Sequence, residues 1–243
     1  MLRALPSARR SSALRSETRS GRRSRRDAAS GLQRAGDGNR AFARTTSRIS
    51  QSSSSIVERF DQLVTTPAAR DALGWLRSAT GRVNGPMERH CMRVHQIAVE
   101  LADRRGWAFD REVMLVASIL HDVGLYPSAS RGGVYTQDGA ELARELLHRH
   151  GWSDHRVDRC AEAIDRHHDV RRQLARGGEV EAVRLADLID LSGGLISCGL
   201  DRRWLRQLAH TVPRRGLAGE LARELGRALR ERPLTLIAIF RRP

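Results

Sequence analysis

The dipeptide His121-Asp122 most constrains what this chain can fold into, because it places two polar side chains at the end of an apolar run. Residues 113–120 are almost entirely apolar, and Gly124, a residue type that commonly stops a helix, follows the dipeptide. Polar groups at the inner end of a buried helix are costly unless they are paired or bind a metal ion. A His-Asp pair is also compatible with a simple helix C-cap, so its meaning depends on the rest of the chain.

Two further predicted helices also carry polar side chains on their apolar faces. His90 heads a stripe of apolar residues at i+4, i+7 and i+11, which places it on the side that faces the core. Asp187 occupies an apolar position of the predicted helix 179–191, and Asp190 lies about 60° away around the same helix. One divalent cation would satisfy all of these inward groups, since imidazole and carboxylate are both good ligands. Asp190 is a partner of a ligand, or the ligand itself if the register is shifted.

The order His, then His-Asp, then Asp resembles the HD superfamily of metal-dependent phosphohydrolases. The resemblance covers roughly residues 85–195: His90 in Arg-His-Cys-Met, His121-Asp122 in Ile-Leu-His-Asp-Val-Gly, and Asp187 in Arg-Leu-Ala-Asp-Leu-Ile-Asp. It implies an all-α fold, a helical bundle of the HD-domain type. It also implies that these four side chains hold a divalent metal ion, with Mn, Fe, Co, Ni, Zn and Mg as candidates.

Two features of the sequence favour one ion per chain. Asp138 stands where relatives with two metals often place a histidine, and Leu125 stands where the signalling phosphodiesterases of the superfamily carry lysine. The pair His167-His168, at the end of the predicted helix 153–168, instead resembles the two-metal relatives. Three roles for this pair stay open: cations favoured by a helix C-terminus, a phosphate contact in the wall of the site, or ligands of a second metal.

The resemblance implies a hydrolase in which the metal activates water. Two histidines and two aspartates leave positions open on a six-coordinate ion, which water and a substrate oxygen would fill. Asp122 and His167 are the expected catalytic residues, with Asp122 positioning the water or taking its proton. His168, Arg131 and Asp138 are the candidate substrate-binding residues, since an arginine can clamp a phosphate through two hydrogen bonds.

The expected activity is hydrolysis of a nucleotide or another small phosphate ester, as a phosphomonoesterase or a phosphodiesterase. A branch of the superfamily hydrates small nitriles such as cyanamide with the same four ligands, and a compact pocket without arginine would favour that alternative. A non-enzymatic nucleic-acid adaptor is a third hypothesis, which rests only on a basic N-terminal segment. We therefore expect a small, phosphorylated partner rather than nucleic acid.

Most of the formal net charge of +15 lies in the first 50 residues. They contain thirteen arginines and three acidic residues, so they carry +10, and the remaining 193 residues carry only +5. Residues 1–55 are rich in Arg, Ser and Ala and poor in large apolar residues, so they cannot bury enough surface to fold. All 43 basic residues are arginine, which is more typical of GC-rich coding than of a selected phosphate-binding surface.

We expect residues 1–55 to be a disordered segment, or the product of a start codon assigned too far upstream. A segment rich in Arg and Ser and poor in acids also fits a transit peptide, and a nucleic-acid-binding arm is the third interpretation. Residues 56–243 are long enough for one helical domain, with the motif core at 85–195 and a C-terminal helical extension.

Hydrophobic periodicity predicts helices almost throughout the domain, which supports the all-α class. A Gly/Ser/Pro-rich loop over 124–138 leaves directly from the His-Asp pair and is placed to cover a site. The stripe Leu217, Leu221, Leu225 and Leu229 predicts a last helix that ends before Pro233. Residues 234–240 are apolar and could form a short strand or a packed tail. The other predicted helices are 56–64, 68–78, 87–105, 110–122, 138–150, 153–168, 179–191 and 204–209, with a turn over 81–86.

The cysteines and the hydropathy pattern bear on the compartment. Cys91, Cys160 and Cys198 form no CxxC motif and leave one cysteine over, as expected for reduced thiols. No apolar run reaches the roughly 20 residues of a membrane span, and no secretory signal is evident. We expect a cytoplasmic protein without membrane association, and we leave homo-oligomer formation open.

Removal of residues 1–50 tests the interpretation of the N-terminal segment. We expect the shortened chain to keep its fold and any turnover, because the segment lacks core-forming residues. Limited proteolysis of the full chain should give a stable fragment that begins near residue 55. A shortened chain that unfolds or loses turnover would contradict this expectation, and loss of nucleic-acid binding alone would favour the adaptor hypothesis.

Overall fold

Helix caps set the boundaries of the helices in the computed structural model, which describes residues 56–57 and 59–231. The Asp110 side chain caps α3 by accepting hydrogen bonds from the N–H groups of Glu112 and Val113. Gly106 ends α2 in the left-handed conformation, at φ 63°. The described part contains eight α-helices and no strand, so the all-α prediction is confirmed. The helices are α1 (Pro67–Thr80), α2 (Pro86–Arg105), α3 (Arg111–Leu120), α4 (Tyr135–Arg149), α5 (Asp154–Asp165), α6 (Gly178–Leu191), α7 (Arg202–Thr211) and α8 (Leu217–Glu231).

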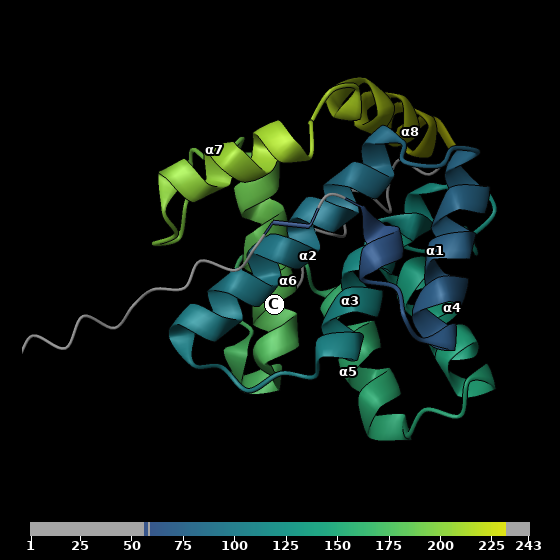
Figure 1. Cartoon of the computed structure of the whole chain (residues 1–243). Helices are drawn as coiled ribbons and strands as arrows, with labels where there is room; N and C mark the ends of the chain where they lie inside the picture. The colour runs from purple at the N-terminus through teal and green to yellow at the C-terminus, as the bar shows by residue number, and fades with distance from the viewer. Residues whose placement is uncertain (1–55, 58, 232–243) are drawn as a thin grey trace, which may run out of the picture. The chain divides into compact units, whose positions relative to one another are not determined.

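The packing of α2 and α5 forms the centre of this helical assembly. Helix α2 packs against both α3 and α6, and α5 packs against α3, α4 and α6 (Figure 1). Most side chains of α2, polar ones included, are buried. The consecutive helices α2 and α3 therefore come together with the distant helix α6, and these are the helices predicted to carry His90, His121 and Asp187.

Several elements differ from the predictions. Among the described residues of the predicted helix 56–64, only the 3₁₀ turn η1 (Phe60–Gln62) is present, and the buried ring of Phe60 anchors it to the core. Helix α4 begins at Tyr135, so the loop after the His-Asp pair is shorter than predicted. Helix α5 ends at Asp165, so His167 and His168 follow the helix. The predictions for residues 1–55 and 234–240 lie outside the described residues.

Helix α8 buries only the first part of the predicted leucine stripe, Leu217 and in part Leu221. Leu225 and Leu229 are exposed, whereas Glu220 and Glu224 are buried. Hydrogen bonds determine which face of α8 is buried. The Tyr126 hydroxyl donates a hydrogen bond of 2.6 Å to Glu220 Oε1, and the Arg227 guanidinium donates to the carbonyl of Leu125. These bonds attach α8 to the segment that directly follows the His-Asp pair.

Gly124 permits a close backbone contact rather than ending a helix. Helix α3 already ends at Leu120, and Gly124 lies in the 3₁₀ turn η2 (Val123–Leu125). A Cβ atom at this position would collide with the carbonyl oxygen of Tyr135 at the start of α4. The missing side chain therefore lets η2 lie directly against α4, which holds Tyr135 beside the His-Asp pair.

Within the described residues, no helix is both long enough and apolar enough to cross a membrane. The expectation of a protein without membrane association stays a prediction.

Two glycine-to-alanine substitutions should have opposite effects on stability. Gly124→Ala should lower the free energy of unfolding by about 2 kcal/mol or more, because its Cβ meets backbone that cannot move aside cheaply. Gly74→Ala, at an exposed position of α1 with nothing near the new Cβ, should raise it by about 0.5–1 kcal/mol. Urea unfolding of both variants measures the difference. Equal effects of the two substitutions would contradict the proposed close contact.

Candidate metal centre

Hydrogen bonds fix the orientation of the imidazole rings of His90 and His121. His90 Nδ1 lies 2.7 Å from Asp190 Oδ2, and His121 Nδ1 lies 2.9 Å from the carbonyl oxygen of Ser118. Because both partners only accept hydrogen bonds, each Nδ1 carries the proton and each neutral ring keeps its lone pair on Nε2. The two Nε2 atoms face each other at 3.2 Å. In two neutral rings these facing lone pairs repel, and a shared cation, either a proton or a metal ion, removes that repulsion.

Two carboxylates complete this group of converging ligand atoms. Asp122 Oδ2 lies 3.4 Å from His121 Nε2 and 3.6 Å from His90 Nε2. Asp187 Oδ1 lies 3.3 Å from His90 Nε2 and 3.8 Å from His121 Nε2. Ligand atoms bound about 2.0–2.2 Å from one ion lie roughly 3–3.5 Å from their neighbours, so these spacings fit a single metal ion.

An unsatisfied buried oxygen gives a second test of the fit. Asp187 Oδ1 has no hydrogen-bond partner among the described residues, although the side chain is only 2% exposed. A buried carboxylate oxygen without a partner costs considerable free energy. A cation at the convergence point would pair with this oxygen, so the donor set suits a metal ion on geometric and electrostatic grounds.

The electrostatics of the cluster also favour a cation. Burial raises the pKa of Asp187, but the neighbouring imidazoles of His121 and His90 outweigh it and hold this pKa well below its usual range. Burial lowers the pKa of His90, but its hydrogen bonds to the surrounding carboxylates outweigh it and raise that pKa. The carboxylates are therefore ionised, and they attract a proton or a metal ion into the centre.

His167 and His168 stand next to this group on the other side of Asp122. His167 Nδ1 lies 2.6 Å from the carbonyl oxygen of Ile164, which leaves Nε2 facing Asp122 Oδ1 at 3.5 Å. His168 Nδ1 lies 3.6 Å from Asp187 Oδ2. Ligand atoms of Asp122, His167 and His168 lie within 4.8 Å of one another, so they form a second group that could hold an ion. Asp122 is shared, with one oxygen directed at each group.

Arg131 and Asp138, the other two candidate substrate-binding residues, have contacts around the start of α4. The Arg131 guanidinium pairs with Glu145 at 2.6 Å, and its backbone N–H donates to Asp138 Oδ2 at 2.8 Å. These contacts attach the loop before α4 to that helix. The role of both residues in substrate binding stays a prediction.

Arg93 and Tyr135 also contact the centre, although the sequence analysis did not single them out. The structure also shows the role of Asp190, which the sequence had left open. Arg93 is 1% exposed and binds Asp190 through two hydrogen bonds, of 2.8 and 2.9 Å. Asp190 in turn orients His90, so it acts as the partner of a ligand rather than as the ligand. The Tyr135 hydroxyl contacts His168 Nε2 and lies 3.5 Å from His167 Nε2. A signal for Arg93 was present, because it follows His90 by three residues and so lies on the same helix face.

Comparisons with known proteins agree with this geometry. Residues 87–192 match the family model of the HD domain. This part of the chain is therefore similar to HD domains, and the matched region contains all four predicted ligands. HD domains bind divalent metals, and the His/Asp cluster could hold such an ion. The match to this domain thus supports the interpretation of the protein as a metal-dependent hydrolase.

Among solved structures, one similar chain is the crystal structure of a predicted HD superfamily hydrolase from an uncultured Thermotogales bacterium. It is 22% identical, with a TM-score of 0.44, and the match covers 70% of this chain and 97% of that chain. No curated protein matches the sequence.

The chain should bind a divalent ion, and Asp190 should set the affinity without being a ligand. Elemental analysis of protein purified without chelator should find a transition metal, and metal should raise the melting temperature because it binds the native state. Asp190→Asn should weaken metal affinity by roughly 10- to 100-fold with the fold retained, as for other partners of metal-bound histidines. Asp103→Asn, at an exposed carboxylate of α2, is the control. Unchanged affinity in Asp190→Asn would contradict this role.

Proposed function

We propose that this protein is a metal-dependent phosphohydrolase that acts on a nucleotide or another small phosphate ester. The convergence of His90 Nε2, His121 Nε2, Asp122 Oδ2 and Asp187 Oδ1 carries this proposal. When bound there, a divalent ion would lower the pKa of a water molecule and polarise the phosphoryl group. We further propose one resident ion per chain, with the Asp122, His167 and His168 group as the alternative site of a second.

Asp122 and His167 are placed to move a proton next to the ion. Asp122 Oδ1 faces His167 Nε2 at 3.5 Å, so a water molecule bound near Asp122 lies within reach of both groups. His167 Nδ1 is held by the Ile164 carbonyl, which fixes the ring and leaves Nε2 free to accept or donate. The Tyr135 hydroxyl and His168 lie beside them, at positions suited to hydrogen bonds with substrate oxygens.

One observation favours a second candidate function, the hydration of a small nitrile such as cyanamide. His90, His121, Asp122 and Asp187 are at most 4% exposed, and the His168 side chain, at 23%, is more accessible. Among the described residues, no ion pair joins an arginine to Asp122 or Asp187. An enclosed centre without a neighbouring guanidinium suits a compact, uncharged substrate better than it suits a phosphate ester. A large phosphate ester would need the loop before α4 to move.

The remaining expectations about partners and location stay predictions. We propose a small-molecule substrate rather than nucleic acid, a cytoplasmic location, and self-association as an open possibility. The adaptor hypothesis keeps its single basis, the charge of residues 1–50.

A substrate screen distinguishes the two enzymatic candidates. Purified protein should be tested with nucleotides, a generic phosphomonoester, a phosphodiester and cyanamide, each with several divalent metals. Release of phosphate or of a phosphomonoester supports the phosphohydrolase, and urea from cyanamide supports the hydratase. His121→Ala should abolish turnover and metal binding together. Equal rates for wild type and His121→Ala on the best substrate would assign the activity to a contaminant and contradict both candidates.

His167→Ala separates the roles that the sequence left open. If His167 lines the reactive face, as its contact with Asp122 indicates, turnover should fall by roughly 100-fold or more with metal content retained. A fall from two ions to one would identify a second-metal ligand. Loss of only about 1 kcal/mol of stability with unchanged turnover would reduce it to a helix cap. His155→Ala, at an exposed position of α5, is the control and should change none of these quantities.

A further inference from the structure

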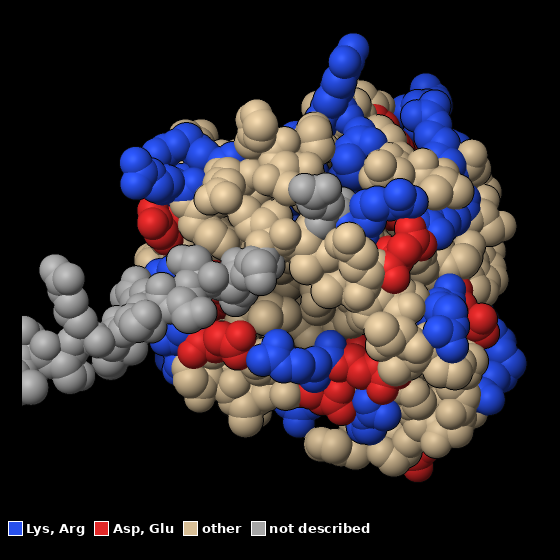
Figure 2. Space-filling view, in the orientation of Figure 1, with Lys and Arg blue, Asp and Glu red and all other residues tan. Residues whose placement is uncertain are grey.

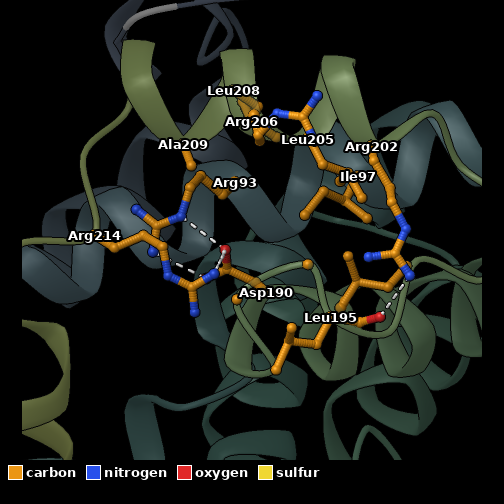
Figure 3. Close-up of a pocket in the computed structure, with 13 residues that line it drawn as sticks. Arg93, Ile97, Asp190, Leu195, Arg202, Leu205, Arg206, Leu208, Ala209 and Arg214 are labelled. Carbon is orange, nitrogen blue, oxygen red and sulfur yellow. Dashed lines mark hydrogen bonds and ion pairs between the residues drawn. The ribbon is translucent and has the colours of Figure 1, made fainter.

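A cavity of about 200 Å³ is lined by Asp190 together with residues of α2 and α7 (Figure 3). It is enclosed by α2, the C-terminal end of α6, α7 and the segment after α7. Its walls combine apolar side chains with an unusual concentration of one charged residue type. The lining includes the apolar residues Ile97, Leu205 and Leu208, the arginines Arg93, Arg202, Arg206 and Arg214, and the acid Asp190.

The positive charge in this cavity exceeds the negative charge. Arg93 and Asp190 neutralise each other at the base of the cavity, and Arg214 NH1 reaches the same carboxylate at 3.4 Å. Arg202 NH2 donates to the carbonyl of Leu195 at 3.1 Å. Within the described part of the chain, neither Arg202 nor Arg206 has a carboxylate partner. One carboxylate thus faces four guanidinium groups.

The two arginines of α7 stand on the same face of their helix. Arg202 and Arg206 are separated by four residues, a spacing that places side chains side by side. Like charges at this spacing destabilise a helix, and a bound anion would convert that repulsion into attraction. The wider surface has the same sign here: in Figure 2, basic side chains stand over α7 and α8 at the upper edge of the face shown.

We propose that this cavity binds a compact phosphoryl anion, either inorganic phosphate or the phosphate group of a small molecule. Guanidinium groups present paired donors that match phosphate oxygens, and the chain offers several of them around one space. The volume is smaller than the roughly 300–1,000 Å³ of sites that enclose drug-sized ligands, so the cavity suits a phosphate group better than a whole nucleotide.

The anion site is separate from the metal centre but adjacent to it. Asp190 Oδ2 binds His90 Nδ1, and Asp190 Oδ1 is the oxygen that Arg214 approaches from the cavity. The Asp190 carboxylate therefore lies between His90, a predicted metal ligand, and a phosphate that binds Arg202, Arg206 and Arg214. The phosphate does not touch His90 itself. The competing explanation is that the arginines only neutralise the carbonyl groups at the end of α6.

Calorimetric titration at constant ionic strength tests the proposal, with inorganic phosphate and AMP as separate probes on the full chain. Wild type should bind phosphate, and the double variant Arg202→Gln/Arg206→Gln should bind it at least about tenfold more weakly. Arg203→Gln, an exposed arginine of α7 that does not line the cavity, is the matched control and should bind like wild type. All of these positions are exposed, so the variants should keep the wild-type melting temperature.

The outcomes separate this site from the proposed catalytic centre. Phosphate binding that survives in His121→Ala and is lost in the α7 double variant supports the cavity, whether or not the enzyme proposal holds. In His121→Ala, where the metal centre is disabled, tighter binding of AMP than of phosphate would identify a phosphorylated small molecule as the occupant, and equal affinities would identify the free anion. No phosphate binding by wild type, equal weakening by Arg203→Gln, or binding lost only in His121→Ala would overturn the proposal.

Discussion

The metal centre depends on the hydrogen bond between His90 Nδ1 and Asp190. Without it, nothing in the described structure would fix which nitrogen of His90 carries the proton, and the ring could not present its lone pair to His121 and Asp187. Asp190 can serve this role in a buried site because Arg93 neutralises it through two hydrogen bonds. Burial would raise the pKa of Asp190, but hydrogen bonds with His90 and Arg93 outweigh it and lower this pKa, so the carboxylate stays ionised.

The fold keeps the remaining parts of the centre in place through close packing on the opposite side. The absence of a side chain at Gly124 lets η2 lie against the start of α4, where Tyr135 points toward His167 and His168. Helix α8 then attaches to the same segment through Tyr126 and the Leu125 carbonyl. Residues directly after the His-Asp pair therefore connect the ligands to two helices, which limits how far Asp122 can move.

Much of the centre could be predicted because its residues interrupt a periodic pattern. A histidine or aspartate at an apolar position of a buried helix is visible in the sequence, and His90, His121 and Asp187 are such cases. The side of a helix that meets a particular neighbour is less visible: α8 buries Glu220 and Glu224 but leaves Leu225 and Leu229 of the leucine stripe exposed, and a hydrogen bond from Tyr126 holds Glu220 in place. The contacts of Arg131 were equally invisible, because its guanidinium binds Glu145 and its backbone N–H binds Asp138.

The central claim is that four side chains, two from α2 and α6 and two from the residues directly after α3, share one metal ion. Anomalous X-ray diffraction from crystals grown with a transition metal, recorded on both sides of the absorption edge of that metal, tests it most directly. The account predicts an anomalous peak about 2.0–2.2 Å from Nε2 of His90 and of His121, in contact with the carboxylates of Asp122 and Asp187. A fully occupied ion elsewhere, or no peak at these side chains in metal-saturated crystals, would contradict it.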